Sequence, residues 1–192
     1  MQIYFGSGGN LKILNALKHS QPDPKQQVTD SCYVSVVPTK SSIYRLLNWL
    51  ASSGETLLAR DKMNDLYSMA HVTIMYSKNK GPDQSNMVNG VNSVSHHQYD
   101  VPLVGTVTEF EEWDGHNNEG YLVAKIDSPE LNKLHEKWKS FGCEHSFPDF
   151  EAHTTIISPY ANGSVTVEEL NDRLKDFPIV LEFVNEQAVP IE

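Results

Sequence analysis

The chain has 192 residues, of which 39% are hydrophobic and 21% are charged. This length and balance are typical of one compact globular domain that can bury a core. The formal net charge is −10, and the sequence has no cluster of Lys and Arg of the kind that grips many phosphates. The composition therefore argues against a long nucleic acid as partner, and if the substrate is a nucleotide, it is expected to be small and held in a pocket.

The sequence shows no segment typical of export or membrane insertion. No apolar run approaches the roughly 20 residues that span a bilayer, and the N-terminus lacks the basic and apolar parts of a secretory signal. Cys32 and Cys143 are far apart and have no second pair, which indicates neither a disulfide framework nor a zinc knuckle. We therefore expect a protein of a reducing cytoplasm that binds no membrane.

Residues 1–30 are poorly patterned and are expected to form an N-terminal arm or extension, with the folded domain covering 31–192. Gly6, Gly8 and Gly9 lack the preceding strand and the Gly-Lys-Ser/Thr of a phosphate-binding loop. These glycines are therefore not expected to cradle a phosphate. No cofactor is expected for the chain.

Alternating β-rich runs and amphipathic runs predict the elements of the first half. They are a strand at 32–37 ended by Pro38, a helix capped by Ser41 or Ser42 that ends near Gly54, a strand at 71–76, and a polar surface loop at 78–100. A hairpin is then expected from strands at 103–110 and 120–126, around the turn DGHNN.

The second half repeats the order strand, helix, strand. Its helix is expected to begin with the cap Ser128 and Pro129 and to end at Gly142. A strand follows from His153, then a helix with the capping box Thr166 and Glu169, and a last strand at 179–184. This doubling predicts an α+β fold of two sheet lobes about a pseudo-twofold axis, each with its His-x-Thr strand at the centre.

The two His-x-Thr motifs each offer an imidazole and a hydroxyl on one face of a strand. Along a strand alternate side chains share a face, so His71, Thr73 and Met75 are expected to point one way. His153 and Thr155 have the same relation. Brought together, the four groups suit cleavage of a ribose phosphodiester: one neutral histidine takes a proton and one protonated histidine donates one. The threonine hydroxyls are expected to hold the non-bridging oxygens.

Two other interpretations compete with this one. Taken alone, either histidine is more readily explained as a core or strand residue than as a catalytic one. A metal site needs three or four convergent ligands, and the other histidines are isolated along the chain except for His96 and His97, which are adjacent and rarely point at one ion. We therefore expect no metal.

The motifs HVTIMYS and HTTIISPY, with the element order over about residues 31–186, resemble the 2H phosphoesterase superfamily. Within it, the segments MNDLYSMAHVTIMYS and FEEWDG are most similar to the anti-CBASS phage nucleases. This resemblance implies a bilobal 2H phosphoesterase-like fold. It also implies metal-independent cleavage of cyclic di- and trinucleotide messengers, such as cyclic GMP-AMP, with which infected bacteria trigger abortive defence. The location implied is the cytoplasm of the infected host.

By position, the resemblance makes His71, Thr73, His153 and Thr155 the catalytic residues. It makes Tyr33 and Trp113 the residues that pack against the bases, although both are also plausible as ordinary packing residues. Glu186 matches an acidic residue that contacts a base edge or ribose, with Glu182 as a rival. The alternatives are an RNA-repair, 2′,5′- or cyclic phosphodiesterase of the same superfamily, and a non-catalytic cyclic nucleotide sponge.

Overall fold

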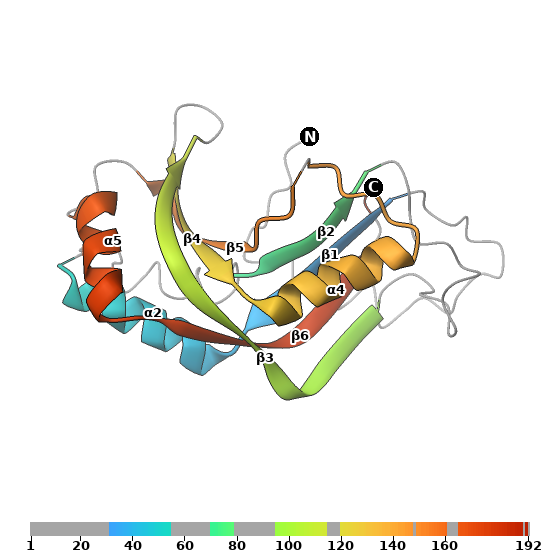
Figure 1. Ribbon diagram of the computed structural model, residues 1–192, viewed down its shortest axis with the longest axis horizontal. Coiled ribbons are helices and arrows are strands. Elements are labelled where there is room, and N and C mark those ends of the chain that lie inside the picture. Colours follow the sequence, from blue (N-terminus) through green and yellow to red (C-terminus); the bar gives the residue numbers. More distant parts are fainter. Residues whose placement is uncertain are drawn as a thin grey trace.

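The computed structural model describes residues 31–54, 70–78, 95–114, 120–147, 149–160, 165–189 and 191. Within them, one antiparallel sheet has six strands in the order β2-β1-β6-β3-β4-β5 (Figure 1). The strands are Cys32–Pro38 (β1), Val72–Ser77 (β2), Ser95–Trp113 (β3), Gly120–Asp127 (β4), His153–Tyr160 (β5) and Val180–Val189 (β6). The arm expected over residues 1–30 lies outside the described residues.

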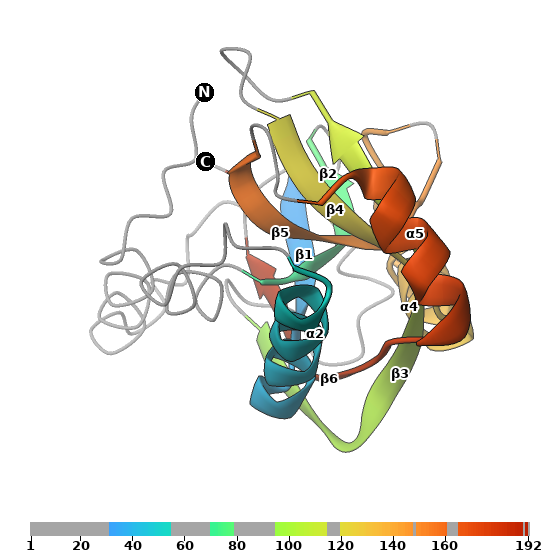
Figure 2. The same cartoon turned by 90° about the vertical axis from the view of Figure 1, so that its left-hand side faces the viewer.

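The sheet curls until its two edge strands, β2 and β5, contact each other, so the described strands form a nearly closed, barrel-like sheet (Figure 2). The expected bilobal fold, with two sheet lobes around a central cleft, is therefore wrong. The physical reason is the pairing of β3 with β6 in the middle of the order, which joins the two expected halves into one sheet. As a result, the two His-x-Thr strands are the edges of the sheet and not the centres of lobes.

The doubled element order is nevertheless present within this single sheet. The unit β1-α2-β2 and the unit β4-α4-β5 lie at opposite ends of the strand order, each with its motif strand outermost. The helices are α2 (Lys40–Ser52), α4 (Pro129–Ser140) and α5 (Val167–Asp176). In Figure 1, α2 and α5 lie toward one end of the sheet, against β6 and β3, and α4 lies toward the other, against β3 and β2.

The helix caps follow the sequence in two cases of three. Ser128 caps α4, with Pro129 in its first turn, and Thr166 caps α5 in a full capping box with Glu169. The cap expected for α2 at Ser41 or Ser42 is wrong, because Thr39 accepts the Ser42 amide at 3.1 Å. Ser42 is buried, and its hydroxyl instead accepts the backbone amide of Glu182 in β6.

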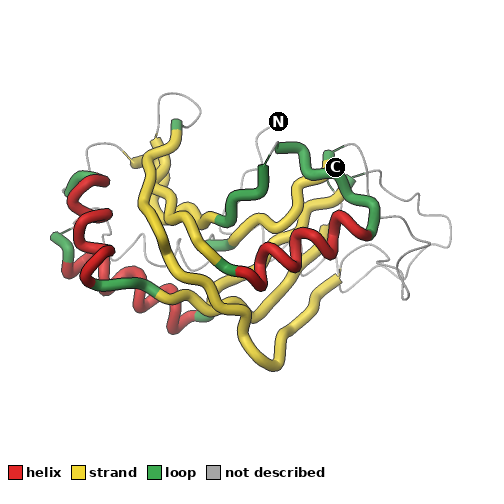
Figure 3. Tube along the Cα trace, viewed as in Figure 1, coloured by secondary structure: helices red, strands yellow, loops and turns green. Residues whose placement is uncertain are grey.

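Strand β3 begins earlier than expected. The loop expected at 78–100 is wrong for residues 95–100, which belong to β3 and of which 95–98 pair with β6. Residues 79–94 lie outside the described part. The strand bends where its register with β6 shifts, between Gln98 and Leu103 (Figure 3). Pro102 falls in this bend, where its missing N–H costs no ladder bond. The polar composition of residues 95–100 is typical of a loop, and the sequence therefore did not indicate that this segment begins a strand paired with β6.

The core is one continuous cluster in which α2, α4 and α5 cover the sheet. Leu50, Ile74, Phe110 and Phe183 are fully buried in it. Cys32 and Cys143 are also buried, and their sulfurs lie 3.2 Å apart in a thiol–thiol hydrogen bond rather than a disulfide. No helix in the described ranges is long and apolar enough to cross a bilayer.

Candidate active site

Each His-x-Thr motif lies at the start of an edge strand and is followed by a one-residue bulge. The register of β2 with β1 skips Ile74, directly after Thr73. The register of β5 with β4 skips Ile156, directly after Thr155. A bulge bends and twists its strand and resets which side chains share a face. The two motifs therefore have the same backbone irregularity at the same position, in addition to the same residues.

The bulge at Ile74 corrects one detail of the expected strand geometry. Simple alternation placed Met75 on the face of Thr73, but Met75 is fully buried. Beyond the bulge it is Tyr76 that joins Thr73 in lining a cleft. In the pairing with β1, Thr73 lies opposite Ser35 and Tyr76 lies opposite Tyr33. Ser35 and Tyr33 are two positions apart and therefore share a face of the sheet.

The cleft has a volume of about 510 Å³, which is within the usual range for small-molecule sites. Four of the residues expected in the site line it: Tyr33, Thr73, Trp113 and His153. They come from β1, β2, β3 and β5, so the curling of the sheet is what brings them together. The cleft is thus lined by one residue of each His-x-Thr motif and by both aromatic residues that were expected to pack against bases.

Tyr33 connects the members of the first motif. Its hydroxyl lies 3.1 Å from the Thr73 hydroxyl, and its ring meets that of His71 edge-on, with 6.1 Å between ring centroids. Burial raises the pKa of Tyr33, so the phenol stays protonated and can donate. His71 is half-buried and lies beside the cleft lining rather than in it.

His153 is held in one orientation by its own backbone neighbourhood. Its Nδ1 lies 2.8 Å from the Glu151 carbonyl oxygen, and because a carbonyl only accepts, Nδ1 carries the proton. In the neutral ring Nε2 is then the basic nitrogen. Burial lowers the pKa of His153, against the opposing effects of the Glu151 carbonyl and the Glu151 and Glu111 carboxylates. These conditions favour a neutral imidazole that can take a proton.

Trp113 lies against this histidine and is fixed by a charged network. The two ring centroids are 4.4 Å apart, with the rings tilted by 54°. The indole N–H donates to Glu111 at 2.6 Å, and Lys125 bridges Glu111 at 2.9 Å and Glu151 at 3.4 Å. These two donors hold the pKa of Glu111 below its usual value. The tryptophan is therefore positioned before any ligand arrives.

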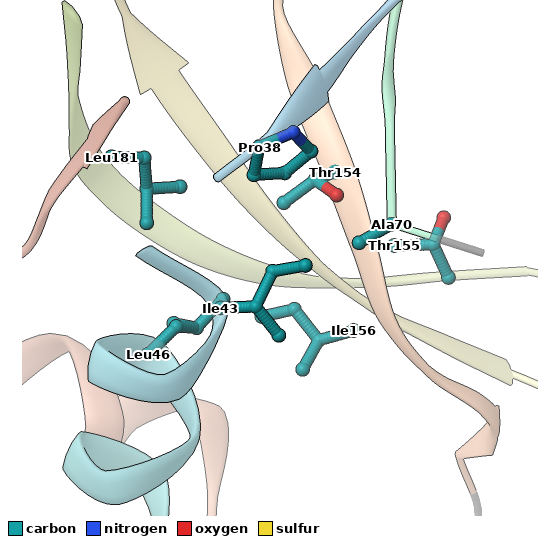
Figure 4. Close-up of a pocket in the computed structure, with 8 residues that line it drawn as sticks. All are labelled: Pro38, Ile43, Leu46, Ala70, Thr154, Thr155, Ile156 and Leu181. Carbon is teal, nitrogen blue, oxygen red and sulfur yellow. The ribbon is translucent and has the colours of Figure 1, made fainter. Parts of the chain in front are cut away.

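Thr155 lies outside the main cleft. With Ala70, the residue before His71, it lines a separate cavity of about 10 Å³, about the space of a single water. Figure 4 shows the two residues side by side, with the adjacent Thr154 closer to Pro38. The start of β2 and the start of β5 therefore meet, and the two motifs are neighbours in space although 82 positions separate the two histidines (153 − 71).

The acidic residues expected near a base or ribose lie elsewhere. Glu186 is buried, and its two oxygens accept from the Trp138 indole at 2.8 Å and from the Tyr99 hydroxyl. Glu182 is half-buried beside the N-terminus of α2, where its backbone bonds to Thr39 and Ser42. Neither residue is among those that line the cleft.

Sequence reasoning missed the segment that follows α4. This segment contributes five residues to the lining of the cleft: His145, Phe147, Asp149, Phe150 and Glu151. Tyr76 of β2 is a sixth lining residue that the sequence did not indicate. The available signal was the aromatic spacing of EHSFPDFE just before the second motif. Within the described ranges no three His, Cys, Asp or Glu side chains gather as metal ligands would.

The fold and the cleft define the class: a curled antiparallel-sheet protein whose edge strands present histidine, threonine and aromatic side chains to a site the size of a small molecule. The chain belongs to the family described as Anti-CBASS protein Acb1, which matches residues 30–192. Its function is therefore anti-CBASS. The comparison with curated proteins finds no match.

Proposed function

We propose that the chain is a metal-independent phosphodiesterase that cleaves cyclic di- and trinucleotide messengers in the cytoplasm of the infected host, and so blocks CBASS. The observation that carries this proposal is the single cleft lined by Thr73 of one motif and His153 of the other, with Tyr33 and Trp113 beside them. Anti-CBASS family membership supports it, and so does the negative charge of the chain, which favours a small nucleotide over a long one.

In the proposed reaction, His153 is the general base of the first step. Its basic Nε2 takes the proton of a ribose 2′-hydroxyl, and the freed oxygen attacks the adjacent phosphorus. The bond from phosphorus to the 5′-oxygen breaks, and protonated His71 donates to that leaving oxygen. The products of this step are a 2′,3′-cyclic phosphate and a free 5′-hydroxyl. The lowered pKa and the Nδ1 hydrogen bond of His153 are the reasons to assign it the base role.

The hydroxyls of Thr73 and Thr155 are proposed to hold the non-bridging oxygens as negative charge builds on them. Thr73 already faces the cleft, with its hydroxyl next to that of Tyr33. Thr155 lies where the two edge strands meet. Trp113 and Tyr33 are proposed to pack against the bases, an interaction that needs only a π face and tolerates different bases.

The test is cleavage of cyclic GMP-AMP and of cyclic triadenylate by the full chain in EDTA, followed by chromatography of the products. Wild-type chain is expected to cleave, and His71→Ala and His153→Ala to lose at least roughly 100-fold of the rate, the usual scale of general acid–base catalysis. His97→Ala is the matched control, because His97 is an exposed histidine of β3 outside the cleft. It is expected to keep full activity.

The outcomes separate this function from its alternatives. Full activity in both histidine variants contradicts the site. Activity that EDTA abolishes contradicts metal independence. Intact messenger recovered after heating the mixture indicates a sponge, and cleavage of linear 2′,5′-oligoadenylate alone indicates a 2′,5′-phosphodiesterase.

A further inference from the structure

A further aromatic pair lies in the cleft, apart from the pair of Trp113 and His153. Tyr76 and Phe147 stack with 5.8 Å between ring centroids and 28° between ring planes. Both line the cleft, and 57% of Phe147 is exposed. The first aromatic pair involves the edge strand β5 through His153, and this one involves the other edge strand, β2, through Tyr76. The cleft thus has an aromatic pair at each of the two edge strands.

The segment that carries Phe147 is tied to β2 by hydrogen bonds. The Ser146 amide donates to the Tyr76 carbonyl at 2.7 Å, and the Tyr76 amide donates to Nδ1 of His145 at 3.2 Å. The Glu144 amide donates to the Ser77 hydroxyl at 2.9 Å. In Figure 1 the chain leaves α4 and runs along β2 before it reaches β5. Phe147 is therefore held in place while its ring faces the cleft.

The Phe147 ring leaves apolar surface in contact with water, and this contact lowers the stability of the protein. Aromatic residues with an open face on a rigid base are typical of ligand contacts, because little conformational freedom is lost when a flat ligand stacks on them. The backing ring of Tyr76 adds to this, since it prevents Phe147 from folding back against the sheet. A flat, uncharged base fits this surface better than a sugar or phosphate does.

We propose that Phe147, backed by Tyr76, is a second base-stacking surface, so that the cleft binds nucleotides that carry at least two bases. One base stacks at Trp113, and another stacks on Phe147. This inference rests on the proposed function and deepens it, because it makes the number of bases a determinant of binding. A mononucleotide occupies one aromatic surface only and is bound more weakly.

The test is calorimetric titration of the full chain, in EDTA, with a non-hydrolysable phosphorothioate analogue of cyclic di-AMP and with AMP. Stacking on one aromatic residue corresponds to roughly 5- to 150-fold in affinity. Phe147→Ala is expected to weaken binding of the two-base analogue within that range and to change binding of AMP by less than about twofold. Phe147→Trp keeps a π face and is expected to retain the affinity.

Phe177→Ala is the matched control. Phe177 is 56% exposed, nearly the same as Phe147, but lies beside Arg173 at the end of α5. It is expected to bind the analogue as wild type does. Unchanged affinity of Phe147→Ala for the analogue overturns the proposal that Phe147 is a stacking surface. If His153→Ala is inactive in the same preparation, the proposed function still stands. Equal loss for AMP and the analogue also overturns the inference, and a wild-type chain that neither binds nor cleaves overturns both proposals.

Discussion

Two neighbouring threonines in the second motif have different surroundings. Thr154 is 1% exposed, and its hydroxyl has no hydrogen-bond partner within the described residues, while Thr155 is half-buried where the two edge strands meet. A buried hydroxyl without a partner costs stability. Thr154 therefore has a packing role, and its unpartnered hydroxyl lowers the stability of the fold.

Thr154→Val is expected to raise the free energy of unfolding by about 1 kcal/mol, because a methyl of similar size replaces the unpartnered hydroxyl. The measurement is urea denaturation with an unchanged m value, together with the rate of messenger cleavage, which is expected to be unaffected. Thr155→Val is the paired comparison and is expected to lose activity. A clear loss of stability in Thr154→Val would show that the hydroxyl has a partner.

The partial burial of His153 predicts a pH dependence of stability. Burial lowers its folded pKa, whereas an unfolded histidine titrates at about 6.5. Between those two pKa values the unfolded chain binds more protons, so the stability from neutral His153 is complete above about pH 6.5 and is lost as pH falls through the folded pKa. Burial shifts the pKa of His145 in the same direction.

We therefore expect the free energy of unfolding to decrease from about pH 7 to about pH 5, and to decrease less steeply in His153→Gln. Urea denaturation at a series of pH values measures both slopes. Carboxylates with a lowered pKa, such as Glu111, lose their contribution to the free energy of unfolding at lower pH. They are present in both the wild type and His153→Gln, so they do not account for a difference between the two slopes. Parallel slopes for the two proteins contradict the lowered pKa of His153.

At the scale of elements, most of the sequence-based predictions are confirmed because local signals decided them. The caps Ser128 and Thr166, the strand from Cys32 and the strand from His153 all follow from side chains and periodicity near in sequence. The bulges at Ile74 and Ile156 could not be predicted, because a bulge is defined by the register with the neighbouring strand. The only local sign is that two adjacent apolar residues follow each threonine, and such pairs also occur in strands that are buried on both faces. The bulges determine that Tyr76, rather than Met75, faces the cleft.

A substitution at Gly105 of β3 tests how closely the middle of the sheet is packed. A Cβ added there would lie 2.5 Å from Cγ2 of Ile126 and 3.3 Å from Cβ of Ser128, so the neighbouring β4 has to give way. Overpacking of this kind costs about 1–3 kcal/mol. Gly105→Ala is expected to lower the free energy of unfolding by that amount in urea denaturation, with activity falling as the strands shift.

The control is a double-mutant cycle with Ile126→Ala, which removes the clashing methyl. The double variant is expected to be less destabilised than the sum of the two single variants. Strict additivity would show that the added methyl at Gly105 is accommodated without contact with Ile126.

At the scale of the whole molecule, the sequence correctly indicated a duplicated strand-helix-strand unit but not how the two copies join. The pairing of β3 with β6 is long-range, and part of it uses residues 95–98, whose polarity is typical of a loop. Two separate lobes were therefore predicted in place of one curled sheet. The assignments of His71, Thr73, His153 and Thr155 as catalytic residues, and of Glu186 as a base contact, remain predictions that the variants above address.

The curling of the sheet also bears on self-association. An open sheet exposes two rows of unpaired amides and carbonyls, which are templates for strands of other molecules. Here β2 and β5 are turned toward each other, and the outer row of β2 is already engaged by the Ser146 amide and the His145 ring. The contact between the two motif strands, together with these bonds to β2, leaves less unpaired backbone for strands of neighbouring copies. We therefore expect strand exchange and fibre growth to be disfavoured in concentrated solutions of this protein.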